Sequence, residues 1–106
     1  MFSYVQVAVK IIETDKIQEE YVRKNLLREA QLMRRLHHPN IIRLYETMKS
    51  STLYCLVMEV AEGEELLSHV KNDFKEKRMS EAAARPFSRQ LVSALYYLHC
   101  SGIVHR

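Results

Sequence analysis

The fold of this chain is decided by the stretch Val5-Gln6-Val7-Ala8-Val9-Lys10-Ile11-Ile12. Branched apolar residues occupy every second position of it, which is the two-residue period of a β-strand. The sequence therefore predicts a strand over residues 5–12. On the other face of that strand, Lys10 stands between Ala8 and Ile12. The strand thus places one cation among apolar neighbours.

A helix is predicted next, from about Val22 to Leu36. Its apolar residues recur in steps of three and four, and Glu29 is the only charge in the stripe Val22, Leu26, Glu29, Met33 and Leu36. No basic residue lies three or four positions from Glu29, so the helix itself offers no ion pair to this carboxylate. A carboxylate that faces a core must find a partner elsewhere or become protonated.

An ion pair between Lys10 and Glu29 would satisfy both charges, because each otherwise lacks a partner. The alternative is that Glu29 lies at the edge of the stripe and reaches water. Lys10 would then extend its aliphatic stem along the apolar surface and leave its ammonium group in solvent.

Two more strands are predicted after this helix. The segment His37-His38-Pro39-Asn40 ends the helix, because the residue before a proline is displaced from helical geometry. A strand is predicted over 41–48 and another over 53–59. The second is a nearly continuous apolar run, which is typical of a strand buried on both faces.

Two helices are predicted to complete the chain, near 64–71 and over 81–100, so the fold class is α+β. Ser80 is predicted to cap the start of the last helix, and Gly102 to end it. Pro86 predicts a kink, or a regular helix that begins only near that residue.

Composition limits the kind of protein this is. A chain of 106 residues allows one small domain. The net charge of +3 is spread among acidic residues, which favours an ordinary solvated surface over nucleic-acid binding. No apolar run is long enough for a transmembrane helix, and the start of the chain lacks the pattern of a signal peptide. A cytoplasmic location is therefore expected, with the nucleus possible, and no membrane partner.

The cysteines and histidines are predicted to be structural. Cys55 and Cys100 lie in apolar runs without the spacing of a metal site, so we expect buried, reduced thiols. The four histidines before the C-terminus show no metal-ligand spacing with one another, and no metal site is predicted; they are His37, His38, His69 and His99.

Five segments, in order, resemble parts of a protein kinase domain. They resemble its third strand with the V-A-I-K lysine, helix C with its glutamate, the fourth strand, the fifth strand with the hinge, and helix E leading into the catalytic loop. The segments are Val7-Ala8-Val9-Lys10, Leu27-Arg28-Glu29, His38-Pro39-Asn40-Ile41-Ile42-Arg43-Leu44, Leu56-Val57-Met58-Glu59, and Ala94 to His99 followed by Ile103-Val104-His105-Arg106. The sequence is most similar in character to serine/threonine kinases of the calmodulin-kinase and AMP-activated-kinase-related group.

The resemblance implies a truncated kinase architecture. Residues 1–59 would form part of the N-lobe, with three antiparallel strands and helix C. Residues 60–63 would be the hinge. Residues 64–106 would begin the C-lobe with helices D and E.

The resemblance also assigns roles in binding ATP. Lys10 would hold the α- and β-phosphates, and Glu29 would hold Lys10. The remaining assignments are Ala8 packed on the adenine, Met58 limiting the back pocket, the backbone of Glu59 and Ala61 at the adenine edge, Glu65 near the ribose, and His105 and Arg106 at the start of the catalytic loop. Glu65 is equally well read as an ordinary acidic residue in the first turn of a helix.

Several kinase elements are missing from these residues. Glycine occurs only at positions 63 and 102, so the Gly-rich phosphate loop is absent. The catalytic aspartate and the ligands of Mg²⁺, which the complete domain uses together with a protein substrate, are also absent. We therefore expect the 106-residue chain to be catalytically inactive. The alternative is a short product that acts as a protein-binding or competing module. The apolar face of the last helix is expected to cause self-association or chaperone binding.

Overall fold

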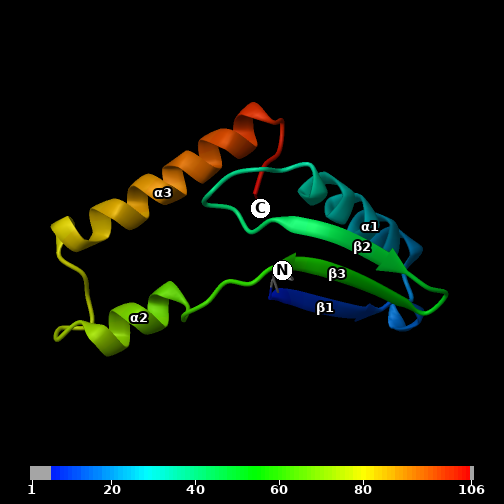
Figure 1. The fold of residues 1–106 in the computed structure, drawn as a ribbon, viewed down its shortest axis with the longest axis horizontal. Helices are drawn as coiled ribbons and strands as arrows, with labels where there is room; N and C mark the ends of the chain where they lie inside the picture. Colours follow the sequence, from blue (N-terminus) through cyan, green and yellow to red (C-terminus); the bar gives the residue numbers. More distant parts are fainter. Residues whose placement is uncertain (1–5, 106) are drawn as a thin grey trace, which may run out of the picture. The chain divides into compact units, whose positions relative to one another are not determined.

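The computed structural model describes residues 6–105 and divides between Ala61 and Glu62 into two compact units. The first unit contains the strands and one long helix (Figure 1). Its elements are β1 (Val7–Glu13), a short 3-10 turn η1 (Thr14–Lys16), α1 (Glu20–Arg34), β2 (Leu44–Lys49) and β3 (Leu53–Glu59). The strand predicted over 5–12 is thus observed, although Val5 lies outside the described residues.

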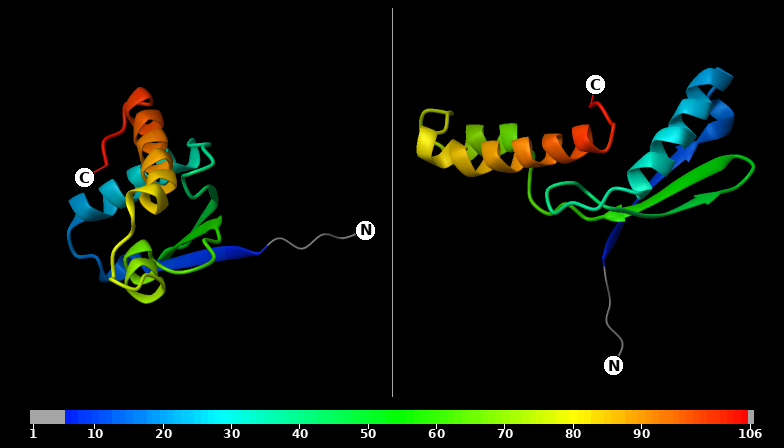
Figure 2. Two further views of the ribbon diagram at one scale, coloured as in Figure 1. Left: turned by 90° about the vertical axis from the view of Figure 1, so that its left-hand side faces the viewer. Right: turned by 90° about the horizontal axis from the view of Figure 1, so that it is seen from above.

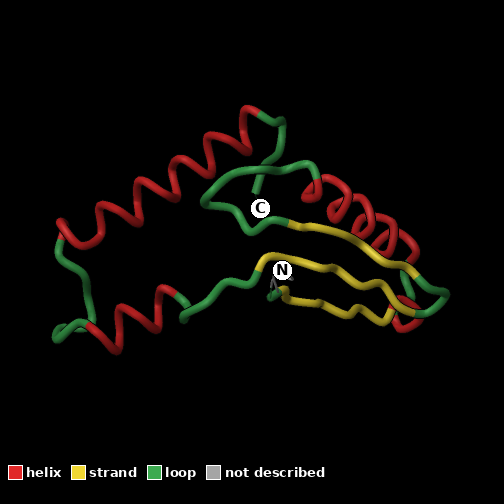
Figure 3. The backbone as a smooth tube through the Cα atoms, in the orientation of Figure 1, coloured by secondary structure: helices red, strands yellow, loops and turns green. Residues whose placement is uncertain are grey.

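The three strands form one antiparallel sheet in the order β1-β3-β2, with β3 in the centre (Figure 3). A tight turn joins β2 to β3, where the Ser50 N–H donates to the Leu53 carbonyl at 2.8 Å. The predicted pairing of the second and third strands is therefore confirmed. The predicted start of β2 at residue 41 is wrong, because the Ile41 N–H instead closes a turn onto the His38 carbonyl at 3.2 Å.

A β-bulge interrupts β2 at Tyr45. Leu44 pairs with Met58 of β3, while Glu46 pairs with the adjacent Val57, so Tyr45 is an extra residue without a partner in the ladder. Such a bulge changes which following residues point toward each face. Leu44, which precedes the bulge and pairs with Met58, lies in the core and is only 1% exposed.

The core lies between α1 and one face of the sheet. Leu44, Tyr54 and Leu56 contribute from the strands, and Ala30, which is 3% exposed, contributes from α1. Ile12, Leu27 and Met58 pack around this cluster. The single methyl group of Ala30 leaves the helix backbone free to approach the sheet closely.

The buried face of α1 differs from the predicted stripe. Val22 and Met33 are exposed, and so is Glu29. The helix instead turns Leu27 and Ala30 toward the sheet. Two members of the predicted stripe do lie inward, since Leu36 is buried and Leu26 is half-buried. The centre of the buried face is nevertheless displaced by about one residue, or about 100° around the helix axis. The predicted stripe follows the large apolar side chains, whereas the small side chain of Ala30 lies in the core cluster.

The opposite face of the sheet is only partly covered. Val7, Val9 and Ile11 of β1 are all exposed, and Cys55 and Val57 of the central strand are half-buried. The prediction that 53–59 is buried on both faces is therefore wrong. β3 is buried only on the face that α1 covers.

The second unit contains α2 (Leu66–Asp73) and α3 (Glu81–Cys100) (Figure 2). The Ser80 hydroxyl oxygen accepts a hydrogen bond from the Ala83 N–H at 3.2 Å, which confirms the predicted N-cap. Gly102 adopts φ +77, and the following Ile103 N–H donates to the Leu98 carbonyl, as expected for a helix stop. The helix is continuous across Pro86, so the alternative of a later start is wrong.

The last helix exposes much of its apolar surface. Leu91 is 61% exposed, and Phe87, Val92 and Tyr96 are exposed as well. Cys100 also lies at the surface and is free, so the prediction that both thiols are buried is wrong; it is the last residue of α3. None of the helices in residues 6–105 has the length and apolarity needed to cross a bilayer.

Candidate functional site

Three of the predicted nucleotide-site residues lie on one face of the sheet. Ala8 of β1 is directly opposite Met58 of β3, and directly opposed residues share a face. Lys10 follows two positions after Ala8 and so belongs to the same face, opposite the buried Leu56. Ala8 and Met58 are half-buried, whereas Lys10 is exposed. The structure thus places an accessible ammonium beside two apolar side chains.

Two hydrogen bonds join Glu59, the last residue of β3, to Arg43, the residue just before β2. The Glu59 N–H donates to the Arg43 carbonyl at 2.8 Å. In return, the Glu59 carboxylate Oε2 accepts from the Arg43 N–H at 3.1 Å. These two bonds fix the backbone just before the predicted hinge.

The backbone of Ala61 is open to a ligand. Within residues 6–105, no hydrogen bond engages its N–H or its carbonyl group. Ala61 is also exposed and lies three positions after Met58. One donor and one acceptor are therefore available in the same unit as Lys10 and Ala8.

The predicted Lys10–Glu29 ion pair does not form. Ion pairs between the described residues join charges close in sequence, such as Lys24 and Glu20 at 3.5 Å, and none includes Lys10 or Glu29. The rotation of α1 that buries Ala30 leaves Glu29 exposed. Because its carboxylate stays hydrated, it has no need of a buried partner. The structure thus agrees with the alternative in which Glu29 reaches water.

The other predicted site residues belong to the second unit. Glu65 is the N-cap residue of α2, and its carbonyl accepts the His69 N–H at 3.0 Å. Its side chain is exposed and makes no cap hydrogen bond. His105 is exposed in the segment after α3. Arg106 lies outside the described residues.

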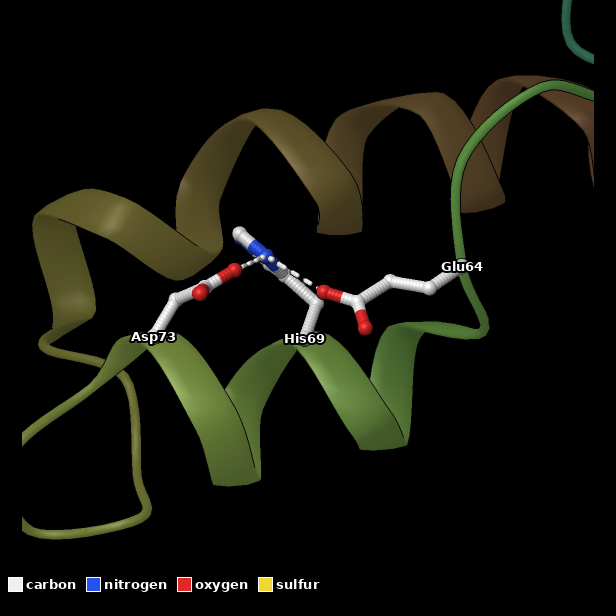
Figure 4. A network of polar contacts seen from close by, with 3 residues as sticks. All are labelled: Glu64, His69 and Asp73. Atoms are coloured by element: carbon white, nitrogen blue, oxygen red, sulfur yellow. Dashed lines mark hydrogen bonds and ion pairs between the residues drawn. The ribbon is translucent and has the colours of Figure 1, made fainter.

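A cluster of three polar side chains around α2 was not predicted (Figure 4). His69 Nδ1 lies 2.5 Å from Asp73 Oδ2 and 3.6 Å from Glu64 Oε1. The spacing of the histidines with one another gives no sign of this cluster, because two of its three members are carboxylates. The four-residue step from His69 to Asp73 was the signal that could have revealed the cluster, because it places both on one helix face.

Comparison with known proteins identifies the family. The model of the protein kinase domain family matches residues 3–106. The hormonally up-regulated neu tumor-associated kinase of Mus musculus is 40% identical over 102 residues, which cover 95% of this chain and 14% of the relative. The CBL-interacting serine/threonine-protein kinase 7 of Arabidopsis thaliana is 45% identical over 101 residues, which cover 94% of this chain and 23% of the relative.

A serine/threonine-protein kinase SIK3 homolog of Danio rerio is 40% identical over 106 residues, which cover 100% of this chain and 9% of the relative. The chain therefore spans less than a quarter of the length of these relatives. Among solved structures, Rad53 1–466 in complex with AMP-PNP matches with a TM-score of 0.75 and 34% identity, over 94% of this chain and 24% of that chain.

These findings confirm the predicted kinase-like α+β fold. They also agree with the order of the five sequence segments, since the family match extends over nearly the whole chain. The chain belongs to the protein kinase domain family.

Proposed function

We propose that this chain is the ATP-binding part of a protein serine/threonine kinase domain. One observation carries the proposal: Ala8, Lys10 and Met58 share one face of the sheet, and the open backbone of Ala61 follows in the same unit. The names of the relatives, which are serine/threonine kinases, support it. The matched structure of Rad53 was determined with AMP-PNP, a nucleotide.

The chemistry of these residues fits ATP. Ala8 and Met58 offer apolar surface to a purine ring. The Ala61 N–H and carbonyl can exchange hydrogen bonds with its edge. The exposed Lys10 carries a compact positive charge with three donors, which suits phosphate oxygens. None of these residues is a magnesium ligand, so the Mg²⁺ that accompanies ATP would be bound by other residues.

Glu29 can form the predicted ion pair with Lys10 only if α1 rotates. In this structure its carboxylate is exposed and forms no ion pair with any of residues 6–105. We propose that the pair forms when α1 rotates about its axis toward the active kinase arrangement. The roles of Glu65, His105 and Arg106 remain predictions.

A chimaera tests the proposed function. This chain would replace the matching 102 residues of the Mus musculus relative, and the product would be assayed with Mg-ATP and a basic serine-containing peptide. We expect phosphate transfer to the peptide. The 106-residue chain assayed alone is expected to show none. A chimaera that folds but neither binds ATP nor transfers phosphate would contradict the proposal and favour a binding module.

The hinge assignment makes a separate prediction about Ala61. In the chimaera, Ala61→Pro removes the backbone N–H that would donate to adenine. Loss of one such hydrogen bond costs about 0.5–1.5 kcal/mol, so we expect KM for ATP to rise by up to about tenfold. Ala61→Gly keeps the N–H and serves as the matched control. Equal KM values for the two variants would show that this N–H does not contact the nucleotide.

A further inference from the structure

We propose that Glu64, His69 and Asp73 form a binding site for one transition-metal dication, best represented by Zn²⁺. One possible ligand atom of each residue lies within 4.8 Å of the other two. Figure 4 shows the three side chains converging beside α2, with Glu64 extending from the segment before the helix toward His69. The inference does not depend on the proposed kinase function.

The backbone positions suit a single ion. His69 and Asp73 are one helical turn apart on α2, and Glu64 directly precedes the N-cap residue Glu65. The ligand atoms of a tetrahedral site, with metal bonds of about 2.0–2.2 Å, are about 3.4 Å apart. The separation of 3.6 Å between His69 Nδ1 and Glu64 Oε1 is already close to that value.

Only a small change in the contact between His69 and Asp73 is needed for both side chains to bind one metal ion. Nδ1 and Oδ2 are now joined by a hydrogen bond of 2.5 Å. An ion would replace that bond, and a side-chain rotation of Asp73 would open the gap by about 1 Å to reach metal geometry. Asp73 is exposed, so its carboxylate can move toward solvent.

The donor set selects the class of ion. Mg²⁺ and Ca²⁺ favour sites built from oxygen atoms alone, whereas Zn²⁺, Ni²⁺, Co²⁺ and Cu²⁺ bind imidazole well. One imidazole nitrogen with two carboxylates therefore favours the second group. The two carboxylates also balance the charge of a dication. Both are exposed, so water can fill the fourth position.

The surroundings of His69 hold its ring in place. The ring meets Phe74 edge-on, with centroids 5.5 Å apart, and it lies 6.1 Å from the ring of Phe87. Ordering a ligand before the ion arrives lowers the entropy cost of binding. Among the described residues, no hydrogen bond engages Nε2 of His69. Nε2 is therefore free to carry the ring proton once an ion displaces the proton shared between Nδ1 and Asp73, which leaves the Nδ1 lone pair for the metal.

Titration calorimetry with ZnCl₂ tests the site directly. The untagged 106-residue chain would first be stripped with a chelator. We expect one Zn²⁺ to bind per chain, and MgCl₂ and CaCl₂ to give no comparable signal. Absence of Zn²⁺ binding would overturn the proposal. Cobalt absorption provides a second readout, because a thiolate-to-metal band would show that Cys55 or Cys100 is the true ligand and would also overturn it.

Variants identify the ligands. Asp73→Asn and Glu64→Gln preserve shape, and each is expected to weaken Zn²⁺ binding by about tenfold or more. His69→Ala should abolish binding, although it also removes the ring that packs on Phe74 and Phe87. The two isosteric variants therefore decide the outcome if His69→Ala does not fold. His99→Ala is the matched control and should bind as the unaltered chain does. Unchanged affinity in both isosteric variants would show an adventitious ion only.

Discussion

Lys10→Met is expected to reduce kcat/KM of the chimaera by about 10²–10³-fold, the usual effect of removing one preorganised charge from a reacting group. Methionine is close to lysine in length and keeps an unbranched apolar stem, so the strand should be unaffected. Lys10 is exposed and opposes Leu56 in the register, which means that its stem, and not its ammonium, borders the core. The loss should therefore reflect the missing contact with phosphate. Steady-state kinetics with varied ATP would separate the effects on kcat and KM.

A second strand lysine provides the control for this measurement. Lys49 ends β2, is exposed and pairs with Tyr54 in the same sheet. Lys49→Met changes the net charge by the same amount and should leave the kinetics nearly unchanged. If the Lys10 and Lys49 variants lost activity equally, the effect would be one of general charge. If Lys10→Met were fully active, its phosphate role would have to be withdrawn.

Leu44→Ala is expected to destabilise the first unit by about 2–5 kcal/mol, the usual cost of a large cavity in a packed core. Leu44 is 1% exposed and contacts the cluster formed by Ala30, Tyr54 and Leu56. Small domains are stable by only about 5–15 kcal/mol, so the loss would remove a large fraction of the free energy that keeps the sheet folded. Hydrogen exchange of β3 amides would measure it, because that signal comes from this unit alone.

Leu67→Ala is the matched control for the core. Leu67 lies in α2 and is 62% exposed. A surface change of this kind is expected to stay within about 0.5 kcal/mol. Equal loss of β3 protection in the two variants would mean that the core between α1 and the sheet is not what stabilises the strands.

The sequence predicted the start and the end of α3 correctly, because both depend on residues close to each other in the chain. Ser80 and Gly102 act through hydrogen bonds to residues a few positions away, so their effects could be read from the sequence. The face of α1 depends instead on distant strands. A stripe of large apolar residues suggested one face, but close packing with the sheet required the small side chain of Ala30.

Only part of the candidate site could be predicted from the sequence. Ala8, Lys10 and Met58 share a face because of the strand period and the pairing of β1 with β3, and both could be expected from the motifs. The Lys10–Glu29 pair failed because it depended on the rotation of α1. The cluster of Glu64, His69 and Asp73 combines a loop residue with two helix residues, and that combination becomes visible only in three dimensions.

The bulge at Tyr45 marks a position at which β2 could lose one residue without losing its pairing with β3. Leu44 and Glu46 pair with adjacent residues of β3, so a chain without Tyr45 would keep every other pairing of the strand. Loss of a later residue, such as Thr47, would turn the side chains beyond it to the opposite face. Deletions among relatives of this chain should therefore be tolerated at position 45 and selected against in the rest of β2.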